Sequence, residues 1–266
     1  MKKLINWFLH KLGYEIVRFS DKQPPVFWLS SNFKELAAAY EGYFQKEEAF
    51  SLEENPLRIK LLSRLRGTPP PEAYFLILGL AKTRKIAGDV CEFGVAQGET
   101  SALLANELRE SEKILHLFDS FQGLPAPSEN DRLIDDIFNL GSMRAYEGTM
   151  ASPREQVAAR LQAVNFPPKR YRIHEGFIED TLVGSSDLPQ QVSFAYVDLD
   201  LYRPTVRALQ FLDSSSKPGA VFIVDDYDYF STGVKEAVDE FVSSHAGYVT
   251  SKPDSIFGKF IILIKT

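Results

Sequence analysis

The chain has 266 residues, 44% of them hydrophobic, a typical size for one α/β domain with additional segments. Its 30 Lys and Arg residues against 36 Asp and Glu residues give a formal net charge of -6, and no segment is dominated by basic residues, so nucleic-acid binding is not expected. The single cysteine, Cys91, excludes an internal disulfide and a cysteine-cluster metal site, and it indicates a reducing, cytoplasmic location.

Residues 1–66 are predicted to form a helical extension before the main domain at 67–266. No small-residue cleavage site follows the start of the chain, and no apolar run reaches the roughly 18 residues of a membrane span. One helical face of this segment is apolar, and we expect it to pack on its own domain or on a second copy of the chain, as in a dimer. Peripheral membrane contact through residues 1–19 is the less favoured alternative. The apolar face consists of Leu4, Ile5, Phe8, Leu9 and Leu12, and further helices are expected around 31–48, 56–66 and 71–85.

From Gly88 onward, apolar segments of strand length alternate with amphipathic helical segments. This alternation indicates a mostly parallel sheet covered by helices on both faces, with ligands bound at the carboxyl ends of the strands. The helix at 152–164 is expected to start with Ser152 as its N-cap and Pro153 at its first position. Strands are expected at 89–94, 113–119, 171–176, 194–200, 219–226, 248–252 and 257–265, and the other helices at 99–110, 204–213 and 232–245.

The end of the first strand, "CEFGVAQGETS", has the features of a nucleoside-binding turn. Gly94 and Gly98 allow a sharp turn and a close ligand approach, although small residues at such turns also serve packing alone. Their Gly-x-x-x-Gly spacing is not the dinucleotide fingerprint. Asp119 ends the next strand, 25 positions after Gly94, where an acid holds ribose hydroxyls. Glu92 lies inside the first strand, where a carboxylate is costly to bury without a partner, and either a ligand or an internal hydrogen bond would supply one. Acids without a pyrophosphate motif favour S-adenosylmethionine over NAD.

Two later strands both end in acid, "VDLD" at Asp198 and "VDD" at Asp225 and Asp226, 27 positions apart. Such carboxylates would repel one another unless a cation lay between them, and oxygen-only ligands suit Mg²⁺. We assign Asp198, Asp225 and Asp226 as metal ligands. Asp200 is a candidate fourth ligand, a substrate contact or a cap of the following helix, and acids after strands commonly serve as such caps.

Together the motifs "GDVCEFGVAQGETS", "LFDSFQGLPAP", "HEGFIEDTL", "VDLDLYRPTVRAL" and "GAVFIVDDY" resemble the macrocin O-methyltransferase family, over roughly residues 66–250. The resemblance implies a Rossmann-like class I methyltransferase fold with a seven-stranded, mostly parallel sheet. It also implies methylation of sugar hydroxyls of natural products with S-adenosylmethionine and Mg²⁺. Thr68 stands where the family often has a Thr-Ser pair, but the prolines after it depart from that pattern. The implied cofactor contacts are Glu92, Gly94, Gly98 and Thr100 near the methionine and ribose, and Asp119, Ser120, Phe121, Gly176, Phe177 and Glu179 near the ribose and adenine.

The expected mechanism is direct methyl transfer to a metal-activated hydroxyl, with Asp198 or a neighbouring carboxylate as the base. Catechol-type relatives carry a lysine at the position of Leu201, so a lysine mechanism is absent. The long segment 123–150 is expected to be a lid with Phe138, Met143 and Tyr146 on its apolar underside, or else a surface insertion. Two other functions stay open at this point: a glycosyltransferase that binds a nucleotide sugar through the "DLD" acids, and a non-catalytic scaffold.

Overall fold

The computed structural model describes residues 55–183, 187–255 and 257–266. The apolar face predicted at the start of the chain and the helix expected at 31–48 lie outside these residues. The dimer, the membrane contact through residues 1–19 and the cytoplasmic location stay predictions. None of the helices in the described ranges is long and apolar enough to cross a membrane.

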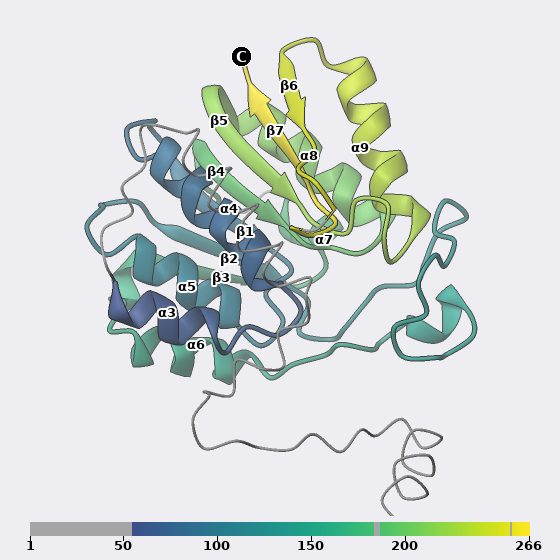
Figure 1. Ribbon diagram of the computed structural model, residues 1–266, viewed down its shortest axis with the longest axis horizontal. Helices are drawn as coiled ribbons and strands as arrows, with labels where there is room; N and C mark the ends of the chain where they lie inside the picture. Colours follow the sequence, from purple (N-terminus) through teal and green to yellow (C-terminus); the bar gives the residue numbers. More distant parts are fainter. Residues whose placement is uncertain (1–54, 184–186, 256) are drawn as a thin grey trace, which may run out of the picture. The chain divides into compact units, whose positions relative to one another are not determined.

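A seven-stranded sheet forms the centre of the described structure, in the order β3-β2-β1-β4-β5-β7-β6 (Figure 1). Neighbouring strands from β3 through β5 are parallel, whereas β7 runs antiparallel to both β5 and β6. The mostly parallel sheet expected from the sequence is therefore confirmed. The strands are β1 Asp89–Phe93, β2 Leu115–Asp119, β3 Tyr171–Glu175, β4 Val192–Val197, β5 Ser216–Val224, β6 Tyr248–Ser251 and β7 Ile261–Lys265.

The helices follow the predicted alternation with strands, with one addition and one correction. The addition is the short α7 directly after β3. The correction concerns Ser152, because α6 begins at Arg154 with Pro153 in the N-cap position and no side-chain cap. Ser152 lies one residue too early and is buried instead. The helices are α3 Pro56–Leu62, α4 Pro70–Lys82, α5 Glu99–Glu107, α6 Arg154–Ala163, α7 Ile178–Thr181, α8 Tyr202–Ser215 and α9 Thr232–Ser244.

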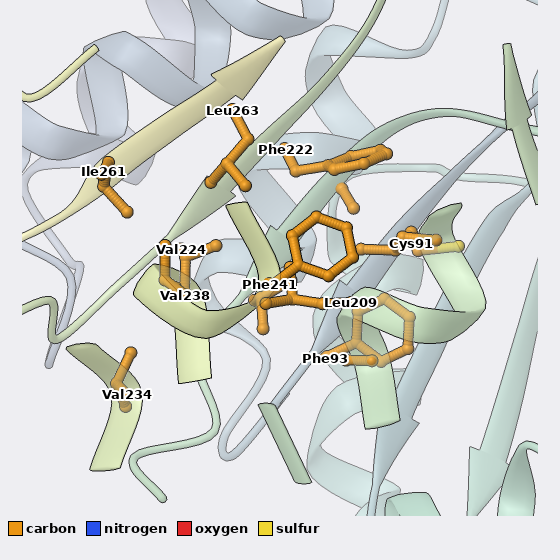
Figure 2. Packing of buried hydrophobic residues seen from close by; sticks show 14 of the residues in the cluster. Cys91, Phe93, Leu209, Phe222, Val224, Val234, Val238, Phe241, Ile261 and Leu263 are labelled. Atoms are coloured by element: carbon orange, nitrogen blue, oxygen red, sulfur yellow. The ribbon is translucent and has the colours of Figure 1, made fainter. Parts of the chain in front are cut away.

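The two faces of the sheet are covered by different helices because strand side chains alternate in direction. On one face Phe93, Phe222 and Leu263 pack against Leu209 of α8 and Phe241 of α9, as Figure 2 shows. On the opposite face α4 comes so close to β4 that a Cβ on Gly79 would lie 2.4 Å from the Phe194 ring. Each fully buried side chain of this size contributes roughly 1.5–3 kcal/mol to folding.

Helix α3 is attached to the domain by packing and by an ion pair. Leu62 packs in a cluster with Ile77 of α4 and Leu103 of α5. The Arg58 guanidinium lies 2.6 Å from the Glu107 carboxylate at the end of α5. The division predicted between residues 66 and 67 stays a prediction, with α3 packed on the helices of the later segment.

Candidate active site

The strand order reverses direction between β1 and β4, and this reversal places two functional loops side by side. The chain moves outward from β1 through β2 to β3 on one side, and from β4 to β5 on the other. The Asp198 N–H donates to the Phe93 carbonyl oxygen at 2.8 Å, so the turn at Gly94 and the start of the acidic loop after β4 are adjacent. Ligands of open α/β sheets bind at this type of position.

A cavity of about 560 Å³ opens at these carboxyl ends of the strands. The sequence-predicted residues divide into those that line it and those that stand behind it. Glu92 and Thr100 are buried, while Gly98 is the left-handed N-cap of α5 and packs on Val157. Phe121 lies beside the cavity with a positive φ of 54°. The predicted residues along the wall are Gly94, Asp119, Ser120, Gly176, Phe177, Glu179, Asp198, Asp225 and Asp226.

Asp119 organises the turn after β1 through its carboxylate. One oxygen accepts the backbone N–H groups of Val95 at 2.7 Å and Ala96 at 2.8 Å, and the other accepts that of Phe121 at 2.6 Å. Asp119 thus joins the ends of β1 and β2 into one rigid edge of the cavity. A ribose hydroxyl bound to Asp119 would donate to the carboxylate lone pairs that do not take part in these three hydrogen bonds.

Glu92 has one satisfied and one unsatisfied carboxyl oxygen. The Ser101 hydroxyl donates to Oε2 at 2.6 Å, which is the internal hydrogen bond considered from the sequence. Within the described part of the chain Oε1 has no hydrogen-bond partner. Burial raises the pKa of Glu92 to about 8, so the isolated side chain is mostly protonated at neutral pH.

Three carboxylates from two strand ends converge in the cavity. Asp198, Asp200 and Asp226 each offer one oxygen, and these oxygens all lie within 4.8 Å of one another. Burial, followed by the negative charges of Asp225 and Asp200, raises the pKa of Asp198 well above its usual range. Burial and the same two charges also raise the pKa of Asp226. Such a crowded, oxygen-only group fits a hard divalent cation such as Mg²⁺, which would relieve the repulsion.

Asp225 stands outside this group of three. Its Oδ2 accepts the Tyr196 hydroxyl at 2.7 Å, and its Oδ1 accepts the backbone N–H of Asp226 at 2.8 Å. Asp226, which lies two positions after the last residue of β5, has a positive φ of 55°, so its carboxylate does not share the direction of the Asp225 carboxylate towards Tyr196. The geometry therefore favours Asp200 over Asp225 as the third carboxylate beside Asp198 and Asp226.

The helix-cap alternative for these acids is not what the structure shows. Helix α8 has Leu201 at its N-cap without a side-chain cap, and the backbone N–H of Tyr202 donates to Asp131 at 2.7 Å. Helix α9 is capped by Ser231, whose hydroxyl oxygen accepts the Gly233 N–H at 3.2 Å. The role of Asp131 could not be predicted from the sequence, because nothing in the spacing of residues relates position 131 to a helix some 70 positions later.

The segment 123–150 forms one side of the cavity. Leu124, Ile137, Phe138 and Met150 line it. The fully buried Tyr146 holds the segment in shape, because its hydroxyl donates to Asp136 at 2.6 Å and accepts the Phe138 N–H at 2.8 Å. Met143 and Tyr146 lie in a 3-10 turn and pack with Leu124, Leu201 and Phe230, while the Phe138 side chain is 52% exposed.

Comparison with known proteins identifies the family. The family model described as Macrocin-O-methyltransferase (TylF) matches residues 78–251. The chain belongs to the macrocin-O-methyltransferase family. A Streptomyces olivaceus protein, 8-demethyl-8-(2,3-dimethoxy-alpha-L-rhamnosyl)-tetracenomycin-C 4'-O-methyltransferase, is 30% identical over 145 residues, which are 53% of this chain. The match covers 54% of that protein, so the chain spans about half the length of this curated relative.

Solved structures of methyltransferases share the fold. The O-methyltransferase NovP superposes with a TM-score of 0.62 at 22% identity, covering 74% of this chain and 81% of NovP. The calicheamicin methyltransferase CalS11 gives a TM-score of 0.61 at 18% identity, covering 94% of this chain and 99% of CalS11. These likenesses confirm the class I methyltransferase fold expected from the sequence.

Proposed function

We propose that the protein is an O-methyltransferase of the EC 2.1.1 class that uses S-adenosylmethionine and Mg²⁺ to methylate a hydroxyl of a sugar, a glycan or a related natural product. The observation that carries the proposal is the convergence of Asp198, Asp200 and Asp226 in the cavity that also contains the Gly94 turn. Family membership supports the reaction class. The rhamnosyl group in the name of the Streptomyces olivaceus relative supports a sugar hydroxyl as the acceptor.

The donor side is proposed to be formed by the ends of β1, β2 and β3. Gly94, Asp119, Ser120, Gly176 and Phe177 line this part of the cavity. The buried Oε1 of Glu92, which has no partner in the described residues, is a further polar group to which the donor's amino acid part would add a partner. Glu179, Gly98, Thr100 and Phe121 complete the proposed set of donor residues.

The acceptor side is proposed to lie at the three carboxylates. A divalent ion there would supply charge that lowers the pKa of the acceptor hydroxyl. Asp198 accepts the hydroxyl proton, with Asp200 as the alternative base. The acceptor oxygen forms its bond to the methyl carbon as the sulfur–carbon bond breaks, and S-adenosylhomocysteine is left. Position 201 is occupied by a leucine, which is buried in the apolar cluster beside Tyr146, so no lysine takes part there.

The acceptor is proposed to carry an apolar group next to the reacting sugar or ring. Ile137 and Phe138 line the cavity and keep exposed fractions of 38% and 52%. Because Tyr146 and Asp136 hold their loop in place, these apolar side chains stay exposed at the cavity without collapsing into the core. An apolar part of the acceptor would cover them.

The test is transfer of a labelled methyl group from S-adenosylmethionine to a panel of glycosides and phenols, with Mg²⁺ and with EDTA. We expect methylation that requires Mg²⁺ and that is lost in the Asp226→Asn variant. Turnover that continues in EDTA would remove the metal from the proposal, and the absence of transfer to every acceptor would favour a non-catalytic scaffold. The glycosyltransferase alternative is not retained, because the "DLD" acids lie in a methyltransferase-family domain and group with Asp226.

A further inference from the structure

Three buried hydroxyl groups connect the donor side of the cavity to the acid-bearing loop after β5. Thr100 Oγ1 lies 3.0 Å from Thr68 Oγ1, and Thr68 Oγ1 lies 3.2 Å from the Tyr196 hydroxyl. The Tyr196 hydroxyl donates to Asp225 Oδ2 at 2.7 Å. Thr100 lies in α5 and Thr68 in the segment before α4. Tyr196 lies in β4 and Asp225 directly after β5, and all four side chains are buried.

For an ionised Asp225 carboxylate, counting protons gives this chain of hydrogen bonds one direction. A tyrosine hydroxyl has one proton to donate. Its shortest contact is Asp225 at 2.7 Å, against 3.2 Å to Glu72 Oε1 and 3.5 Å to Asp198 Oδ2. With that proton on the Asp225 bond, the Tyr196 oxygen accepts from Thr68, and Thr68 in turn accepts from Thr100. Hydrogen bonds arranged head to tail in this way polarise and strengthen one another.

Both ends of the chain reach groups that the proposed function uses. Thr100 is the second residue of α5, directly after the loop whose Gly94, Ala96 and Gln97 line the cavity. At the other end Asp225 accepts the backbone N–H of Asp226. Asp226 has a positive φ of 55°, and its carboxylate belongs to the group of three. Tyr196 therefore orients Asp225, which in turn holds the backbone of Asp226.

We propose that Thr68 and Tyr196 are positioning residues that couple donor binding to divalent-cation binding. The inference rests on the proposed function and adds a coupling between its two sites. A donor that orders the loop after β1 fixes Thr100, and the hydroxyl chain then favours the orientation of Asp225 and Asp226 that a cation needs. Such coupling is reciprocal, so a cation bound at the carboxylates strengthens donor binding by the same factor.

Calorimetric titration with S-adenosylhomocysteine, which lacks the sulfonium charge, tests the coupling in saturating Mg²⁺ and in EDTA. For the wild-type protein we expect Mg²⁺ to tighten binding by about fivefold or more, a typical coupling. Tyr196→Phe and Thr68→Val remove a hydroxyl each and are expected to lose most of this factor. Thr68→Ser retains the hydroxyl and is expected to retain the Mg²⁺-dependent factor in affinity. The serine and valine variants therefore form a matched pair, which tests the coupling even where Tyr196→Phe does not fold.

Two control variants remove hydroxyls of the same types elsewhere. The Thr83 hydroxyl donates to the carbonyl oxygens of Gly79 and Leu80 within α4, and the Tyr248 hydroxyl donates to Asp213. Thr83→Val and Tyr248→Phe should therefore keep the wild-type coupling.

The outcomes separate the coupling from the proposed function. An absence of any Mg²⁺ effect on S-adenosylhomocysteine affinity in the wild type, or an equal effect in Thr68→Val and Thr68→Ser, would overturn the coupling. Mg²⁺-dependent methyl transfer with either of those results leaves the proposed function standing. Intact coupling without methyl transfer to any acceptor leaves the coupling standing and removes the proposed function.

Discussion

A Cβ atom on Gly94 would lie 1.7 Å from the main-chain carbonyl oxygen of Asp198. Only glycine can occupy this position, because the clash is with backbone and no side chain can rotate away from it. The φ of Gly94 is 82°, which adds a second requirement for glycine. The close contact places the turn on the donor side directly beside the first proposed metal ligand.

Gly94→Ala is therefore expected to separate the ends of β1 and β4. We expect a loss of about 2 kcal/mol or more in the free energy of unfolding and a loss of S-adenosylhomocysteine binding. Gly141→Ala is a matched control, since Gly141 has the same φ of 82° but no atom within 4 Å of its added Cβ. Urea unfolding and calorimetry measure both effects. Equal destabilisation of the two variants would show that backbone strain, and not the contact with Asp198, explains the glycine.

Asparagine substitutions at the acids decide which carboxylates bind the cation. The geometry predicts that Asp200→Asn lowers affinity for Mn²⁺, used as a spectroscopic substitute for Mg²⁺, by about tenfold or more. Asp228→Asn is the control, because Asp228 is exposed in the loop that also carries Asp226 and stands outside the group of three. Electron paramagnetic resonance counts the bound Mn²⁺. A large loss in Asp225→Asn with no loss in Asp200→Asn would restore the ligand set assigned from the sequence.

The exposed aromatic side chain on the lid segment is predicted to act on the acceptor and not on the donor. Phe138→Ser removes an apolar side chain that lines the cavity. We expect acceptor KM to rise about tenfold, while the Kd of S-adenosylhomocysteine changes less than about twofold. Leu140→Ser is the control, because Leu140 is also exposed but does not line the cavity. Parallel losses of acceptor and donor affinity in Phe138→Ser would contradict a lid role.

The stacked pair of His116 and His174 predicts a loss of stability in mild acid. Burial, and then the neighbouring His116, lowers the pKa of His174 to about 4 from its usual value of 6.5. As the pH falls from 6.5 towards 4, the unfolded chain takes up a proton that the folded protein does not, so stability declines in this window. Because His174 is only partly buried, we expect a loss of about 1 kcal/mol between about pH 7 and about pH 5.

Urea unfolding at the two pH values measures this loss. His174→Gln should reduce the decline, whereas His245→Gln, which removes an imidazole at the end of α9, should keep it. An identical pH dependence in the wild type and in His174→Gln would show that other groups cause the acid sensitivity.

The sheet was predictable because its strands are short apolar runs separated by helical periodicity, a pattern that local sequence determines. Helix α7 was not predicted, since four residues contain too little periodicity to be recognised. Strand β5 begins at Ser216, before the expected Gly219, because its start pairs with Val192 across an irregular register that the sequence pattern does not reveal.

The position of the acidic residues at the ends of strands was predictable from the sequence, but the orientation of their side chains was not. The sequence places Asp225 and Asp226 equally well at the carboxyl end of a strand. Their different orientations depend on the Tyr196 hydroxyl, which comes from the neighbouring strand β4, and on the positive φ of Asp226. Likewise, the three backbone N–H groups bound by Asp119 depend on how two loops meet. Contacts between distant segments of this type leave no trace in residue spacing.

The buried Asp131 limits how the lid segment can be exchanged between relatives. One carboxyl oxygen accepts the first N–H of α8, and a Cβ on Gly233 would lie 1.9 Å from that same oxygen. The other oxygen accepts the backbone and hydroxyl groups of Ser128. A chimera that replaces all of 123–150 would therefore remove the anchor of a helix that follows the acidic loop, and would lose function for a reason unrelated to acceptor choice. Grafts confined to 134–140 retain Asp131, so a new acceptor preference in such a hybrid would report on recognition itself.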